Sequence, residues 1–426
     1  MLSVFVDFFK NKEIRKRIFF TLFMLFIFRL GSAIPVPGVN TTSIELSGAS
    51  SFLALASLLG GGSLENLSIL SLGVGPYITA SIIIELLSMD VIPALTEMAK
   101  SGKNGRKQLD RITRYLSIAL ALVQGYFTMW SISNQYEIID NAGPETFIYI
   151  SIIITAGTMF TLWLADQITT KGIGNGVSII IFAGIVANMP YNFQSVWSTF
   201  MGEDTTNALG ILGFIIYCIM FIAIIVLVVV MQMSERRMPI QQSSSQALNK
   251  SKGDLNYLPL KINSASVIPV IFASSLISAP LMVTSWINTD VYNTLNSIFD
   301  FTSPWFLCVY AILIILFTFF YTNLTVDPEK MADDLGKQGT YIPGVRPGAE
   351  TKDYIKKVLN RITCLGALLL AFIALLPYVI SNLTDLTQSA AVGGTGIIIV
   401  VGVAMDTIKE LKGQVTTKSY KGFIGK

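Results

Sequence analysis

Ten apolar runs, separated by loops that carry most of the charge, restrict this chain to a narrow class of folds. The runs lie at about 18–34, in the last part of 51–87, and at about 115–133, 147–165, 173–190, 209–233, 264–286, 304–326, 362–381 and 392–408. A bilayer core of about 30 Å is crossed by about 20 helical residues. Because 52% of the residues are hydrophobic and only 13% are charged, we predict an all-α polytopic membrane protein with ten transmembrane helices.

Region 51–87 also contains an apolar piece that is too short to span. Residues 51–60 (SFLALASLLG) are followed by further glycines, and Gly73, Gly75 and Pro76 interrupt the start of the next run. In lipid, a half-length piece persists only inside protein or beside a water-filled cavity. We predict a short re-entrant helix at about 52–65 in a central cavity. A surface amphipathic helix is the alternative.

The basic residues predict how the helices are oriented. Of the 30 lysines and arginines, all but Arg29 fall in six clusters, at 10–17, 100–114, 171, 236–261, 330–361 and 409–426. The five loops between these clusters contain acidic residues but no lysine or arginine. Because basic loops stay in the cytoplasm, both termini are expected there.

Ten crossings divide into two fives, and an odd number per half makes the halves run oppositely through the membrane. We predict two inverted five-helix halves around a central pore. The N-terminal half is 1–190, the C-terminal half is 191–410 with cytoplasmic loops at about 234–263 and 327–361, and a cytoplasmic tail follows at 411–426.

Two charged residues lie inside the predicted helices. Charges at membrane depth cost about 2.5–3.5 kcal/mol on insertion scales, so Arg29 and Glu85 are functional candidates. Snorkelling is the alternative for Arg29. For Glu85 the alternative is simple proximity to water, because Ser88 and Asp90 follow closely.

The composition argues against catalysis. Histidine is absent, and the three cysteines, Cys218, Cys308 and Cys364, lie in different apolar runs. We therefore expect no metal, no cofactor and no disulfide. The chain also contains no phosphate-binding glycine loop, so any energy source must be a partner.

The cytoplasmic stretch 342–361 (IPGVRPGAETKDYIKKVLNR) presents Arg346 on a turn braced by prolines and glycines. A guanidinium presented in this way suits docking to acidic protein or to RNA phosphate. For the neighbouring Lys352, Lys356 and Lys357, a solvated basic face is an equally good explanation.

Six motifs, in order, resemble the SecY family, which forms the protein-conducting channel of the Sec translocon. They are FRLGSAIPVPG (28–38), PYITASIII (76–84), KGIGNGVSIIIFAGIVANMP (171–190), YLPLKINSASVIPVIFASS (257–275), IPGVRPGAETKDYI (342–355) and GGTGIIIVVGVAMD (393–406). The resemblance runs from about Arg15 to the C-terminus.

The resemblance implies a pore that is closed by an aliphatic ring and plugged from outside by the half-length piece. The positions that match the ring are Val74, Ile78, Val177, Ile181, Ile271 and Ile399. The positions that match the plug are Phe52, Leu53, Leu55, Ala56, Leu58, Leu59, Gly60 and Gly61. Ordinary helix packing is the alternative for any single ring position. A lateral gate between helices two/three and seven/eight is implied as well.

The resemblance also implies partners: the small membrane subunits SecE and SecG, the motor ATPase SecA, the ribosome, preproteins with signal sequences, and SecD/SecF. The candidate docking residues for SecA or the ribosome are Arg346, Arg236, Arg237, Lys352, Lys356 and Lys357. The chain departs from the family in two places. The loop after Arg237 is poor in positive charge, and Glu85 stands where the family often has an amide.

From these features we predict a channel subunit of a bacterial-type Sec translocase in the inner membrane, without catalytic activity. A secondary transporter of a small solute is the main alternative, but paired intramembrane charges are absent from the sequence. A passive membrane scaffold would leave the half-length piece unexplained.

Overall fold

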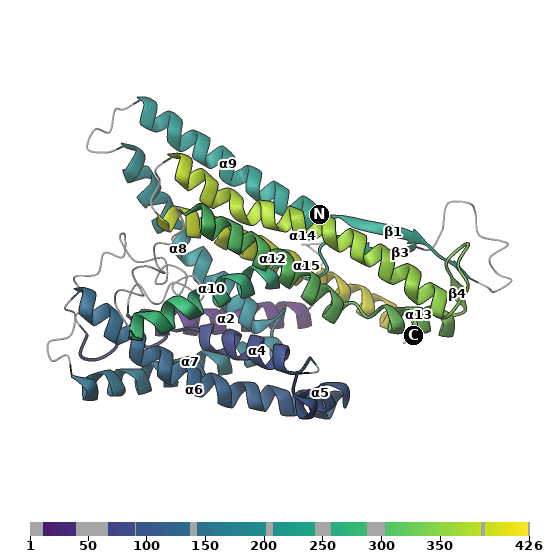
Figure 1. The fold of residues 1–426 in the computed structure, drawn as a ribbon, viewed down its shortest axis with the longest axis horizontal. Helices are drawn as coiled ribbons and strands as arrows, with labels where there is room; N and C mark the ends of the chain where they lie inside the picture. Colours follow the sequence, from purple (N-terminus) through teal and green to yellow (C-terminus); the bar gives the residue numbers. More distant parts are fainter. Residues whose placement is uncertain are drawn as a thin grey trace.

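The computed structural model describes residues 12–39, 67–89, 91–136, 143–201, 208–242, 257–287, 303–384 and 388–424 (Figure 1). The predicted plug at 52–65 lies outside these residues. The described chain is a helical bundle with a small β-structure at one end (Figure 1).

Ten helices follow the ten predicted crossings in order. The first five are α2 (Lys12–Ser32), α4 (Gly75–Leu87), α6 (Lys103–Tyr136), α7 (Pro144–Lys171) and α8 (Gly176–Met201). The second five are α9 (Ala208–Met233), α10 (Ile268–Ile287), α12 (Pro304–Thr325), α14 (Ala349–Thr384) and α15 (Gln388–Ile424). Two short helices, α5 (Pro93–Lys100) and α13 (Pro328–Lys337), precede α6 and α14. The prediction of an all-α polytopic membrane protein is confirmed.

Several predicted boundaries were too short. Helix α8 continues through Pro190 to Met201, whereas the apolar run ended at that proline. Helices α14 and α15 extend beyond their apolar runs on the side of the basic clusters, and α15 continues to Ile424. Hydropathy marks only the part of a helix that lies in lipid, so a polar extension of the same helix is invisible to it.

Within the described residues, five spans are long and apolar enough to cross a membrane by length and composition alone, and they contain α7, α8, α9, α12 and α14. Helix α4 has only 13 residues, so it covers about 20 Å at 1.5 Å per residue. It begins where the glycines and Pro76 predicted an interruption. The buried stretch just before it pairs with the chain after α2, because Val36 N–H donates to Leu67 O (3.0 Å) and Ile69 N–H donates to Ile34 O (3.0 Å).

The two halves repeat one packing pattern. In the first half α4 packs on α6, α6 on α7, and α7 on α8, while α2 packs on α7. In the second half α10 packs on α12, α12 on α14, and α14 on α15, while α9 packs on α14. The two sets of five crossings therefore share a similar order of contacts, as expected for two related halves.

Three buried hydroxyls of α7 are satisfied within their own helix. On α7 the hydroxyls of Thr155, Thr158 and Thr161 donate to the carbonyls four residues earlier, at 2.7, 3.1 and 2.9 Å. Apolar residues also cover the outside: Phe26 and Ile219 are each about three-fifths exposed (61% and 62%). Helices that are apolar on every face belong in a membrane.

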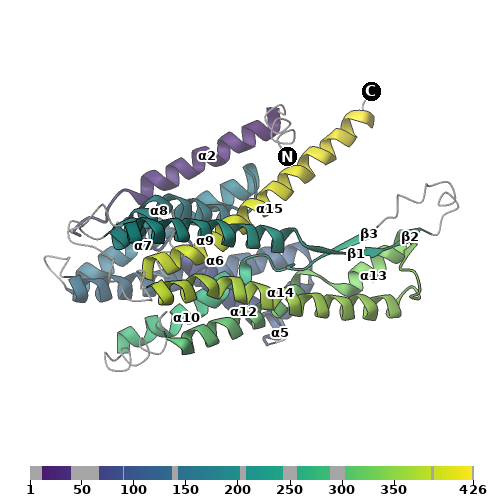
Figure 2. The same cartoon turned by 90° about the horizontal axis from the view of Figure 1, so that it is seen from above.

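The two long loops of the second half join outside the bundle. Strand β1 (Glu235–Pro239) pairs antiparallel with β3 (Tyr257–Lys261), and β2 (Gln241–Gln242) pairs with β4 (Thr340–Tyr341). A small apolar core lies beneath them, made of Met238, Leu260, Leu335, Ile342 and Ile355. Figure 2 shows these strands, α13 and both ends of the described chain toward the same end of the bundle.

Candidate functional site

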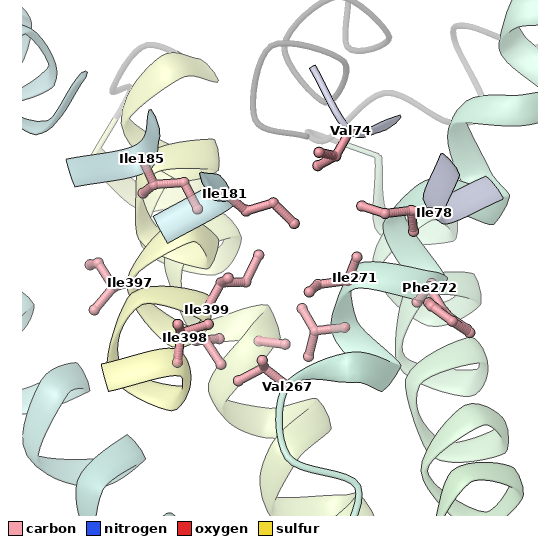
Figure 3. Packing of buried hydrophobic residues seen from close by; sticks show 14 of the residues in the cluster. Val74, Ile78, Ile181, Ile185, Val267, Ile271, Phe272, Ile397, Ile398 and Ile399 are labelled. Atoms are coloured by element: carbon pink, nitrogen blue, oxygen red, sulfur yellow. The ribbon is translucent and has the colours of Figure 1, made fainter. Parts of the chain in front are cut away.

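Five of the six predicted ring residues converge at the centre of the molecule. The side chains of Val74, Ile78, Ile181, Ile271 and Ile399 point toward one another from four helices, two in each half (Figure 3). All five are buried in one apolar cluster. The sixth, Val177, is partly buried and packs against the same cluster.

The residues at the starts of α4 and α8 position the ring side chains that the N-terminal half supplies. Gly73 takes a left-handed backbone (φ 51°), and Val74 then caps α4, with Pro76 in the first turn. On α8 the Asn175 side chain accepts from the N–H groups of Val177 (3.0 Å) and Ser178 (3.3 Å). This cap begins the helix so that residues four apart, such as Val177 and Ile181, lie on one face.

The start of α10, which carries Ile271, is clamped against α15, which carries Ile399. A Cβ at Gly402 would collide with the Val267 side chain, so only glycine permits this approach. Ser266 has φ +56°, and its hydroxyl donates to the Asp406 carboxylate at 2.7 Å. The Asn263 side chain donates to the Ser266 carbonyl at 2.8 Å. The sequence pattern did not reveal this clamp, because it joins residues 140 positions apart.

The halves contact each other unequally on the two sides of the ring. On one side α8 packs extensively on α15 and α9. On the other, α10 packs on α4 and α6 with a smaller contact, which we call the seam (Figure 1). At the seam, the Tyr321 hydroxyl of α12 donates a hydrogen bond to the Glu85 carboxylate of α4. Tyr321 also packs edge-on against Phe272 of α10, with ring centroids 4.8 Å apart.

Comparison with known proteins decides the family. A family model for SecY matches residues 68–408. The chain is 44% identical over its full length, and that of the relative, to the protein translocase subunit SecY of Bacillus licheniformis. It is 43% identical over the full length of both chains to the same subunit of Staphylococcus aureus. This chain belongs to the SecY family.

Solved structures agree on the fold. A protein-conducting channel matches with a TM-score of 0.70 at 19% identity, covering 93% of this chain and 91% of the other. Sec61 in a canine ribosome–channel complex matches with a TM-score of 0.68 at 18% identity, with the same coverage. Both matches cover more than nine-tenths of this chain, so its fold is that of these channels.

Among the predicted docking residues, Arg346 lies on an exposed turn. Its side chain is 87% exposed, and the nearest carboxylate oxygen, of Glu350, is 3.9 Å away. Gly344 and Gly348 take positive φ angles of 83° and 100° on either side of it, and the Thr351 hydroxyl donates to the Arg346 carbonyl at 2.8 Å. The turn is therefore held rigid while the guanidinium remains accessible.

Two other docking candidates of this SecY-family chain are engaged within it. The Arg237 guanidinium donates to Glu235 at 2.8 Å and lies 4.8 Å from the Tyr257 ring centre. Lys352 donates to Glu329 at 2.7 Å, and this hydrogen bond raises the pKa of Lys352. The remaining candidates, Arg236, Lys356 and Lys357, are exposed.

The described residues hold no group of three or more histidine, cysteine or carboxylate side chains that could bind a metal ion. Cys218, Cys308 and Cys364 are free thiols. The convergent aliphatic ring is the part of this SecY-family chain with the clearest physical consequence. Its side chains have no polar group that could replace the water around an ion. A narrow apolar constriction of this kind can block ion flow by dewetting.

Proposed function

We propose that this chain is the central channel subunit of a Sec protein translocase. It passes unfolded preproteins across the membrane and releases hydrophobic segments sideways into lipid. The observation that carries this proposal is the convergence of buried aliphatic side chains from both halves, at Val74, Ile78, Ile181, Ile271 and Ile399. Because both halves supply side chains to this ring, the ring closes the pore when the halves meet and opens it when they separate.

The chemistry of the ring suits a polypeptide that must keep moving. Branched aliphatic side chains exclude water when they touch. An ion would have to lose its hydration shell to enter such a dry constriction, so ions do not pass. They give a passing peptide no specific polar partner, so no particular peptide sequence binds tightly enough to stop in the ring. A small-solute transporter instead needs a midplane binding site of polar or charged groups.

Lateral release follows from the seam. A hydrophobic segment at the contact of α10 with α4 and α6 gains about 25 cal/mol for each Å² of apolar surface that leaves water. Transfer of an apolar helix into lipid is therefore downhill once the seam separates. The plug proposed at 52–65 would occupy the outer side of the ring in the closed state.

We assign the energy source to partners and propose no catalytic activity for this chain. SecA or the ribosome would dock on the cytoplasmic loops through Arg346, Arg236, Lys356 and Lys357, with Arg237 and Lys352 bracing the surface. SecE and SecG would complete the membrane complex, and SecD/SecF would assist from the membrane. The proposed location is the inner membrane, with both termini in the cytoplasm.

The test is reconstitution of the chain with SecE and SecG in lipid vesicles, with SecA and ATP outside. We expect ATP-dependent protection of an unfolded preprotein from protease. A preprotein locked in a folded state by a crosslink serves as the control and should stay accessible. If the purified complex took up a small solute but no preprotein, the proposed function would be wrong.

A further inference from the structure

Glu85 is a carboxylate at the seam whose hydrogen-bond partner belongs to the other half. It lies two residues before the C-terminal end of α4, which ends at Leu87. Tyr321 donates to it from α12, across 236 positions of sequence. Tyr321 itself is only 5% exposed and packs on Phe272 and Phe320. This hydrogen bond closes the seam on the side of the ring toward the basic loops.

Among the described residues, no basic side chain pairs with this carboxylate. Helices α10 and α12, which face it across the seam, contain no charged residue. On its own side, Arg114 of α6 is paired with Asp166 of α7 at 2.7 Å.

Separating the seam breaks the hydrogen bond from Tyr321, which is the only polar contact of the Glu85 side chain among the described residues. A carboxylate left without a partner at membrane depth is costly, whereas one that finds a cation is stabilised. A segment that opens the seam and brings a lysine or arginine to this position would replace Tyr321. A segment without a cation would leave the carboxylate unpaired.

The distance between Glu85 and the ring fits the length of a signal peptide. Seven residues separate Ile78 in the ring from Glu85, which is about 10 Å along the helix at 1.5 Å per residue. A signal peptide has a positively charged flank followed by an apolar stretch of about 7–15 residues. With its basic flank at Glu85, its apolar stretch would lie along α4 and α10 and reach the ring.

We propose that Glu85 determines specificity at the seam: it holds the seam closed through Tyr321 and accepts the basic flank of the segment that opens it. This proposal rests on the proposed function. Two variants separate the two roles. Glu85→Gln keeps a hydrogen-bond acceptor for Tyr321 but removes the charge, while Tyr321→Phe keeps the charge but removes the donor.

The experiment compares vesicle import of one preprotein in two forms, with two lysines or two glutamines before its apolar stretch. For the unsubstituted chain we expect faster import of the lysine form. Glu85→Gln should reduce the ratio of the two rates roughly tenfold, which equals about 1.4 kcal/mol. Tyr321→Phe should raise import of both forms and leave their ratio unchanged. Glu85→Lys with two glutamates before the apolar stretch should restore a preference, now for the acidic form.

The outcomes separate the two proposals. If the unsubstituted chain imports neither form, the channel function fails. If it imports both and Glu85→Gln leaves their ratio unchanged, the role of Glu85 is refuted while the channel function stands. Equal loss of both forms in Glu85→Gln, or a retained preference for lysine in Glu85→Lys, would also overturn the role of Glu85.

Discussion

Replacing Ile399 by asparagine tests whether the ring is a seal or ordinary packing. Ile399 lies on α15 and is 1% exposed, and its side chain points toward Ile271 of α10 on the other side of the ring (Figure 3). Asparagine is polar and smaller, so it removes apolar contact and places an amide in a dry position. We expect a looser seal and import of preproteins with defective signal sequences.

The magnitude follows from burial. Burying an isoleucine side chain contributes about 1.5–3 kcal/mol, and leaving a buried amide without a partner costs about 1–3 kcal/mol. The closed ring therefore loses at least about 2.5 kcal/mol. In the open state the same side chain meets water or a passing peptide, so most of this loss belongs to the closed state alone. At 1.4 kcal/mol for each factor of ten, the closed-to-open ratio falls about 60-fold.

Ile397 provides a matched control on the same helix. It is also 1% exposed, but its side chain points away from the ring (Figure 3). Ile397→Asn should lower thermal stability without relaxing selectivity, because it damages packing within the closed and open states alike. The assays are ion conductance in planar bilayers and export of a preprotein with a defective signal sequence.

The two variants must differ for the reasoning to hold. If Ile399→Asn and Ile397→Asn gave the same conductance and the same export, position in the ring would be irrelevant. If Ile399→Asn changed only thermal stability, the convergent side chains would be structural packing, and the closed state would be sealed elsewhere.

Three further perturbations have clear expected results. Deleting residues 52–59 should leave a channel that inserts normally and leaks ions in planar bilayers; unchanged conductance would favour a surface helix. Arg346→Glu should abolish ATP-dependent import without lowering expression, and Arg346→Lys should be partly active because a point charge lacks the planar fork; import at the unsubstituted rate by the Glu variant would exclude this turn as the docking site. Gly402→Val should lower the free energy of unfolding by about 1–3 kcal/mol in thermal unfolding, because its side chain collides with Val267. The control Gly336→Val, which has nothing within 4 Å, should lower stability far less. Equal effects of the two variants would disprove the close approach at Gly402.

The sequence predicted the helices that hydropathy and turn chemistry encode locally. Ten crossings, their order, and the interruption before α4 all follow from run length and from Gly73, Gly75 and Pro76. The ends of the helices were harder to predict from the sequence. Pro190 removes one backbone hydrogen bond, but neighbouring helices support α8 beyond it, so the helix does not end there.

The sequence could not reveal contacts between residues that are far apart in the chain. Tyr321 gave no signal, because a tyrosine in an apolar helix is ordinary until a carboxylate from another helix lies beside it. Similarly, Arg237 and Lys352 belong to basic clusters in the sequence, and only the structure shows the carboxylates that hold them. Charge counting finds a basic face but not which of its members are engaged.

The unequal contact between the halves links the ring to the seam. Because α8 packs on α15 and α9 on one side, we expect the halves to separate first where the contact of α10 with α4 and α6 is smaller. A rotation about the α8 side moves each point in proportion to its distance from that side. The seam therefore widens most, and the ring, which lies between, widens less. A segment that separates Ile78 from Ile271 must also strain the Glu85–Tyr321 hydrogen bond, so apolar length and basic flank act on one motion and reinforce each other.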